Sequence, residues 1–149
     1  MGSLDWERQF ELARGGLAPA ALLVGDWVGA GHAHGEAITA TLQVRPVLDG
    51  TQLQVLERVG GHEDISFYRF DVATGQLRVV HLMAPALVAE YPVELTGDGL
   101  VWVTAPTAPT VVWTYDPLSG AVTSEVFWPD QRVAEVKLRY VRAPTPTGA

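Results

Sequence analysis

Polar and apolar residues alternate along most of the chain. Between residues 38 and 45, the apolar residues Ile38, Ala40, Leu42 and Val44 alternate with polar ones, which is the period of a β-strand with one buried face. Turn-forming sequences rich in Gly, Asp and Pro recur from Leu48 onward, at intervals of about ten residues. This pattern predicts a meander of about nine or ten short antiparallel strands.

A helical period precedes the strands. Trp6, Phe10 and Ala13 are spaced as on one face of an α-helix, so we expect a short amphipathic helix from Leu4 to Arg14, ended by Gly15-Gly16. The sequence offers no second helix for a parallel crossover, and closing a sheet removes its exposed edges. The expected fold is all-β: a closed antiparallel meander β-barrel of about ten strands, with the helix lying over one end.

The expected organisation is a single domain. The chain has 149 residues, which is close to the usual size of one domain. We assign residues 4–142 to the barrel and residues 143–149 to a disordered tail, because the tail has no hydrophobic period.

The charge excludes some partners. A formal net charge of −7 repels phosphate, so nucleic acid and anionic membrane surfaces are not expected partners. The apolar run from Leu17 to Val24 is too short for membrane insertion. The chain has no cysteine, which fits a cytoplasmic location. The oligomeric state stays open, a homodimer included.

Strand parity predicts which side chains enter the barrel. In the last strand, Val136, Leu138 and Tyr140 share the inward face, with Arg132 and Arg142 at the two ends of the same row. We expect an internal pocket with Arg132 at its open end, where a guanidinium could pair with an anionic ligand. The expected ligand-binding residues are His81, Met83, Tyr91, Trp113, Trp128 and Arg132.

Four segments resemble a known family. The run Gly25-Asp26-Trp27-Val28-Gly29-Ala30-Gly31 is similar to the Gly-x-Trp signature of the first strand in calycins. The segments 47–53, 70–75 and 136–142 follow in the same order. Together they resemble a bacterial lipocalin-like family of the calycin superfamily and, more distantly, nitrobindin-type haem-binding domains. The resemblance implies a ten-stranded meander barrel.

The resemblance also implies a structural role for three residues. In calycins the indole of the Gly-x-Trp motif packs across the closed end of the barrel against a basic residue of the last strand. Here Trp27 would meet Arg142 or, failing that, Arg139.

No cofactor is expected. Nitrobindin-type domains bind haem through a histidine near the C-terminus, and residues 129–142 contain none. His81 stays the one candidate axial ligand for haem. A metal site built from His32, His34 and the run His62-Glu63-Asp64 is a further alternative, but we assign no metal ligand.

No catalytic residue is assigned, because the sequence contains no known enzyme motif. Glu57, Glu63, Asp64, Glu90 and Glu94 are expected mostly on outward positions or at turns.

The leading hypothesis is a non-catalytic carrier or sensor of a small hydrophobic ligand, which could be anionic. The alternatives are a haem- or NO-binding domain, and a lyase or isomerase that uses His81 near Tyr91 for proton transfer.

Overall fold

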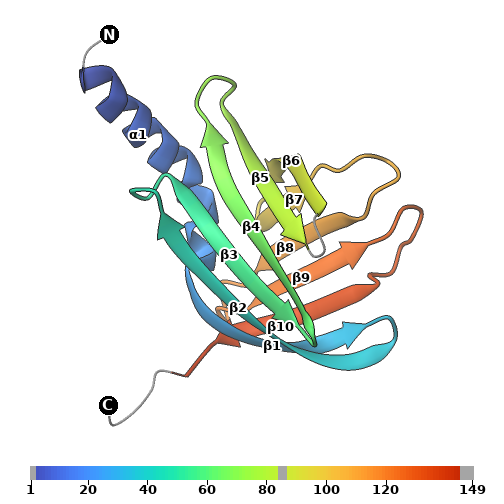
Figure 1. Cartoon of the computed structure of the whole chain (residues 1–149). Helices are drawn as coiled ribbons and strands as arrows, with labels where there is room; N and C mark the ends of the chain where they lie inside the picture. Colours follow the sequence, from blue (N-terminus) through green and yellow to red (C-terminus); the bar gives the residue numbers. More distant parts are fainter. Residues whose placement is uncertain (1–2, 84–86, 145–149) are drawn as a thin grey trace.

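The computed structural model describes residues 3–83 and 87–144 and shows a β-barrel with helices at its N-terminus (Figure 1). The helix α1 (Ser3–Leu17) is followed by a 3₁₀ helix, η1 (Ala18–Leu23). The strands are β1 (Gly25–Ala33), β2 (Glu36–Val47), β3 (Gln52–Val59), β4 (His62–Asp71), β5 (Gln76–Met83), β6 (Leu87–Leu95), β7 (Gly99–Trp102), β8 (Thr110–Tyr115), β9 (Val122–Phe127) and β10 (Val136–Arg142).

The strands form a closed meander. Each strand pairs with the next one in antiparallel orientation, and β1 pairs with β10 to complete the barrel of ten strands. In that last pairing Trp27 lies opposite Arg142, and Gly29 lies opposite Tyr140. The expectation of a closed antiparallel meander barrel is confirmed.

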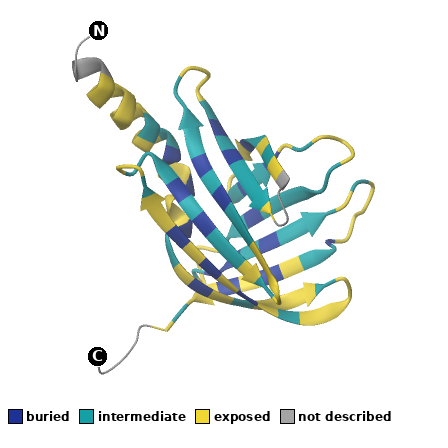
Figure 2. Ribbon diagram, viewed as in Figure 1, coloured by how far each residue is buried: buried dark blue, intermediate teal, exposed yellow. Residues whose placement is uncertain are grey.

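Inward-pointing side chains form a single core. On β2, the buried residues Ala40, Leu42 and Val44 alternate with exposed polar residues, as the two-residue period predicts. Leu138 and Tyr140 do the same on β10. Figure 2 shows these alternating bands of buried and exposed residues along the strands.

Trp27 and η1 seal one end of the barrel, which we call the closed end. Trp27 is 1% exposed, and its indole donates a hydrogen bond to the carbonyl of Leu23 at 2.8 Å. The Arg142 guanidinium lies 4.0 Å from the centroid of the Trp27 ring and also donates to the carbonyls of Val24 and Leu22. These donors satisfy carbonyls at the end of η1, which a helix leaves without internal partners.

Gly25 explains the glycine of the Gly-x-Trp motif. Its φ is +136°, a conformation that side chains rarely tolerate. A Cβ at this position would also lie 2.2 Å from a guanidinium nitrogen of Arg142. The contact between Arg142 and Trp27 therefore requires glycine here. Of the two expected arginines, Arg142 is the one that lies over the Trp27 ring.

The helical segment is longer than expected. We predicted a helix from Leu4 to Arg14 that ends at Gly15-Gly16, but α1 continues to Leu17 and η1 follows it. Gly16 lies within α1, and the ring of Phe70 packs so close to it that a Cβ there would lie 1.9 Å from Phe70 Cγ. The C-terminal part of α1 packs at the rim of the barrel and the helix projects outward (Figure 1), so η1 is the segment that covers the closed end.

Within residues 3–83 and 87–144, neither helix has the length and apolar character needed to cross a bilayer. Ala143 still belongs to the ordered fold, because its amide donates to the carbonyl of Asp26 at 2.8 Å. The remainder of the expected tail, residues 145–149, lies outside the described residues.

Replacing Trp27 by Ala should lower the free energy of unfolding by about 3–5 kcal/mol, the usual cost of a large-to-small change in a packed core. Urea unfolding followed by far-ultraviolet circular dichroism measures this change. Trp6→Ala is the matched control, because Trp6 is 68% exposed and its loss should change stability by less than about 0.5 kcal/mol. Equal effects of the two substitutions would contradict the sealing role of Trp27.

Candidate functional site

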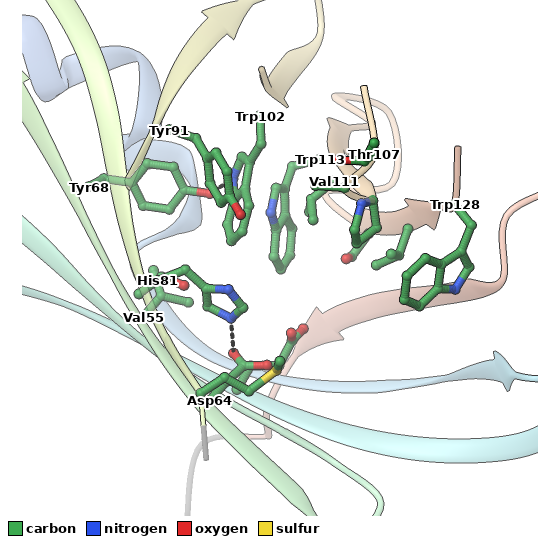
Figure 3. Close-up of a pocket in the computed structure, with 17 residues that line it drawn as sticks. Val55, Asp64, Tyr68, His81, Tyr91, Trp102, Thr107, Val111, Trp113 and Trp128 are labelled. Carbon is green, nitrogen blue, oxygen red and sulfur yellow. Dashed lines mark hydrogen bonds and ion pairs between the residues drawn. The ribbon is translucent and has the colours of Figure 1, made fainter. Parts of the chain in front are cut away.

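A cavity of about 460 Å³ occupies the half of the barrel that faces away from Trp27 (Figure 3). Its walls come from strands β3 to β9, and the loop residues Thr107, Ala108 and Pro109 contribute at its mouth. Met83 and Trp128 also line the mouth and are 41% and 44% exposed. The barrel thus has a sealed end and an open end.

Most of the expected ligand-binding residues lie around this cavity. His81, Met83, Tyr91, Trp113 and Trp128 all line it, so strand parity located them correctly. Whether they bind a ligand stays a prediction.

Arg132 does not line the cavity, and its expected position was wrong. It is exposed and lies in a bend before β10, which begins at Val136. Inward and outward positions alternate only while the backbone is extended, so the parity of β10 does not reach back to Arg132.

Aromatic side chains from neighbouring strands form one wall of the cavity. Trp102 of β7 stacks on Tyr91 of β6, with ring centroids 6.1 Å apart and an angle of 25° between the planes. The Trp102 indole donates a hydrogen bond to the hydroxyl of Tyr68 at 2.8 Å. Trp113 of β8 stacks on Tyr140 of β10 with a centroid distance of 6.1 Å. This wall suits flat, apolar groups.

Sequence reasoning missed Tyr68 and Trp102. The alternation of strand positions could have located them, because residues two positions apart share a face of the strand. Tyr68 shares a face with Ser66, and Trp102 with Leu100. All four residues are buried.

Two carboxylates also point into the cavity. Glu57 of β3 and Asp64 of β4 are direct cross-strand partners, and both line the cavity. We expected these acids on outward positions or at turns, and that expectation was wrong. Glu57 continues the inward row of Leu53 and Val55, so the parity of its strand outweighs the preference of a charge for solvent.

Burial changes the ionisation of Glu57. Burial, together with the nearby Asp64 carboxylate, raises the pKa of Glu57 from 4.5 to about 7. A hydrogen bond from the Tyr140 hydroxyl and the nearby His81 act in the opposite direction. Burial and the Glu57 carboxylate raise the pKa of Tyr140 as well. Glu57 therefore exchanges a proton near neutral pH.

Gly29 makes the contact between Tyr140 and Glu57 possible. The Tyr140 ring lies over Gly29 on the paired strand, and a Cβ at Gly29 would lie 2.6 Å from a ring carbon of Tyr140. The glycine-rich sequence of β1 thus lets the ring lie flat inside the barrel.

His81 contacts an acid and an aromatic ring of the cavity wall. His81 Nε2 lies 3.7 Å from Asp64 Oδ1, and the ring contacts Trp102 edge-on at a centroid distance of 5.2 Å. Figure 3 shows this nitrogen directed at the carboxylate. The haem alternative, with His81 as axial ligand, stays a prediction from the sequence.

His34 is not placed as the alternative metal site requires. His34 lies in the turn after β1 and pairs with Glu135 at 2.7 Å, so it does not share a strand face with His32. Across the part of the chain that the structure describes, no group of three or more potential metal ligands comes together.

The other acids lie outside the barrel as expected. Glu90 accepts hydrogen bonds from Arg69 and Arg78, and these bonds lower its pKa. Glu63 pairs with Arg58 at 2.6 Å.

The geometry defines a barrel with an internal cavity that is mainly aromatic and apolar, with an acidic cluster on one wall. This cluster consists of Glu57, Asp64, His81 and Tyr140. The arrangement can bind a small molecule and can accept or donate a proton near neutral pH. No protein-family model matches the chain, and no curated protein matches it. The resemblance to lipocalin-like barrels therefore stays a prediction from the sequence.

Replacing Glu57 by Gln should stabilise the protein at high pH. The folded-state pKa of Glu57 is about 7, above its ordinary value of 4.5, so its contribution to stability is fully present below about pH 4.5 and is lost as the pH rises through about 7. Gln removes this dependence and keeps an acceptor for Tyr140. The stability of Glu57→Gln relative to the unmodified chain should rise by about 1–3 kcal/mol between pH 4 and pH 8.

Chemical denaturation at both pH values measures this difference. Glu94→Gln serves as the control, because Glu94 is an exposed carboxylate on β6. A stability difference for Glu57→Gln that does not change with pH would contradict the raised pKa.

Proposed function

We propose that the protein binds a small hydrophobic molecule in the barrel cavity and acts as a carrier or sensor without catalysis. The observation that carries the proposal is the cavity of about 460 Å³. This volume lies within the range of about 300–1,000 Å³ that is typical of small-molecule sites. We expect the protein to act in the cytoplasm, as the lack of cysteine suggests.

The chemistry of the lining supports an apolar ligand. Tyr91, Trp102, Trp113 and Val111 present aromatic and aliphatic surface to the cavity. Burying such surface against a ligand contributes about 25 cal/mol for each Å² removed from water. The resemblance to lipocalin-like barrels agrees with this function.

The charges of the cavity do not favour the anionic ligand that the sequence analysis allowed. That option depended on Arg132, which lies outside the cavity, whereas Glu57 and Asp64 lie inside it. An anion would have to approach these carboxylates in a poorly hydrated space, where repulsion between like charges is strong.

A second candidate function is an enzyme that moves protons on a small organic substrate, such as a lyase or isomerase. The observation that favours it is the Glu57 carboxyl, whose pKa of about 7 suits a general acid or base. Native mass spectrometry of protein purified without denaturation gives the mass of a retained ligand. After incubation with the protein, a carried ligand is recovered unchanged, whereas a substrate yields an isomer or a fragment.

Filling the cavity should weaken ligand binding. Val126→Trp adds a large side chain to the lining, because Val126 lies on the cavity wall. The affinity for the neutral dye Nile red should fall by about tenfold or more, equivalent to about 1.4 kcal/mol or more. Fluorescence titration measures the dissociation constant.

Val141→Trp is the matched control, since Val141 lies on β10 and is 41% exposed. It should leave the affinity for Nile red unchanged. Equal affinity of both variants would mean that the dye binds elsewhere, and lack of dye binding by the unmodified protein would contradict an accessible apolar cavity.

A further inference from the structure

We propose that the ligand of this cavity is an aromatic molecule that carries a positively charged amine, with the ring against the aromatic wall and the amine beside Glu57 and Asp64. This inference rests on the proposed binding function and assigns its ligand class.

The charges that face the cavity favour a cation. Among the lining residues that the structure describes, Glu57 and Asp64 are carboxylates and none is Lys or Arg. The arginines of the adjacent outer wall pair with acids outside the barrel, as Arg58 does with Glu63 and Arg78 with Glu90. The inward carboxylates therefore lack a fixed cationic partner, apart from the contact of Asp64 with His81. An ammonium group would compensate their charge.

Trp113 gives an independent indication that a ligand completes the site. Trp113 is 5% exposed and its ring lines the cavity. Its indole Nε1 is buried, and no described residue accepts a hydrogen bond from it. A buried donor without a partner is costly, and an acceptor atom on the ligand would satisfy it.

The aromatic wall fits both parts of the ligand. The Tyr91, Trp102 and Trp113 side chains come from consecutive strands and stand side by side in Figure 3, with His81 and Asp64 across from them. Flat rings stack on such surfaces. The faces of Trp and Tyr also attract cations, so the wall does not oppose an ammonium group.

The proton on Glu57 couples binding to pH. Glu57 is faced by Asp64 from β4, His81 from β5 and Tyr140 from β10. Its pKa of about 7 means that a cation binds best after Glu57 has lost its proton. Binding should therefore release a proton near pH 6.5 and strengthen as the pH rises from 5 to 8.

Three probes of similar shape test the charge preference by isothermal titration calorimetry at pH 8. These are 5-methoxytryptamine, which is cationic, 5-methoxy-3-ethylindole, which is neutral, and 5-methoxyindole-3-propionate, which is anionic. The methoxy oxygen provides an acceptor for Trp113. The cation should bind about tenfold or more tightly than the other two.

Conservative variants identify the residues responsible. Glu57→Gln and Asp64→Asn should each reduce the preference for the cation by about tenfold, while leaving the affinity for the neutral probe within about twofold. Trp113→Phe keeps an aromatic ring and removes the N–H donor, so it should weaken binding of all three probes by about fivefold. Circular dichroism confirms that each variant is folded.

Titrations at pH 6.5 in buffers with different ionisation enthalpies measure proton release. The unmodified protein and His81→Gln should release a proton on binding the cation, and Glu57→Gln should not. This comparison separates Glu57 from His81 as the titrating group.

Several results would overturn the inference. Equal affinity for the three probes, or preference for the carboxylate, contradicts it while the proposed function stands. Binding of Nile red without binding of the cationic probe also contradicts the ligand class and leaves the proposed function standing. Failure of Nile red and of all three probes to bind contradicts both the ligand class and the proposed function.

Discussion

The contact between Trp27 and Arg142 holds together the part of the molecule on which the rest depends. It joins the first strand to the last, where the sheet closes into a barrel. The same two side chains bind the carbonyls of Leu22, Leu23 and Val24, so the closure of the sheet and the seal of its end form together. Because η1 and Trp27 seal one end, the cavity lies in the other half of the barrel.

The polar groups that face the cavity in the open half of the barrel lower the stability of the fold. Glu57 is a half-buried acid beside a second acid, and its removal from water disfavours its charged form. Leu or Met at this position would pack without such a cost. The Tyr140 hydroxyl lowers the cost by donating to Glu57, and the ring of Tyr140 depends in turn on Gly29. Polar groups at this depth are a feature of sites that bind or react.

The sequence predicts the architecture well, because a two-residue period and regular turns leave few alternatives to an antiparallel meander. It also places His81, Tyr91 and Trp113 on the correct face. The errors have physical causes. Arg132 was placed by extending the parity of a strand beyond its first residue. Glu57 was treated as a charge that must face water, although its strand places it inward.

The end of the first helix was predicted wrongly for a different reason. A glycine pair usually ends a helix, and nothing nearby in the sequence reveals that Phe70 needs the space above Gly16. Such a requirement arises only when two segments far apart in the chain meet. The same holds for Trp27 and Arg142, which were identified through a resemblance and not through local pattern.

The separation of the two ends has a consequence for how this protein can diversify. Trp27, Arg142 and η1, which seal the barrel, lie at one end, while loop residues 103–109 and 128–135 lie at the other. Changes in these loops reshape the mouth without touching the contacts of Trp27. The fold can therefore acquire new ligand preferences by loop variation at little cost in folding, which makes the barrel a suitable scaffold for engineered receptors.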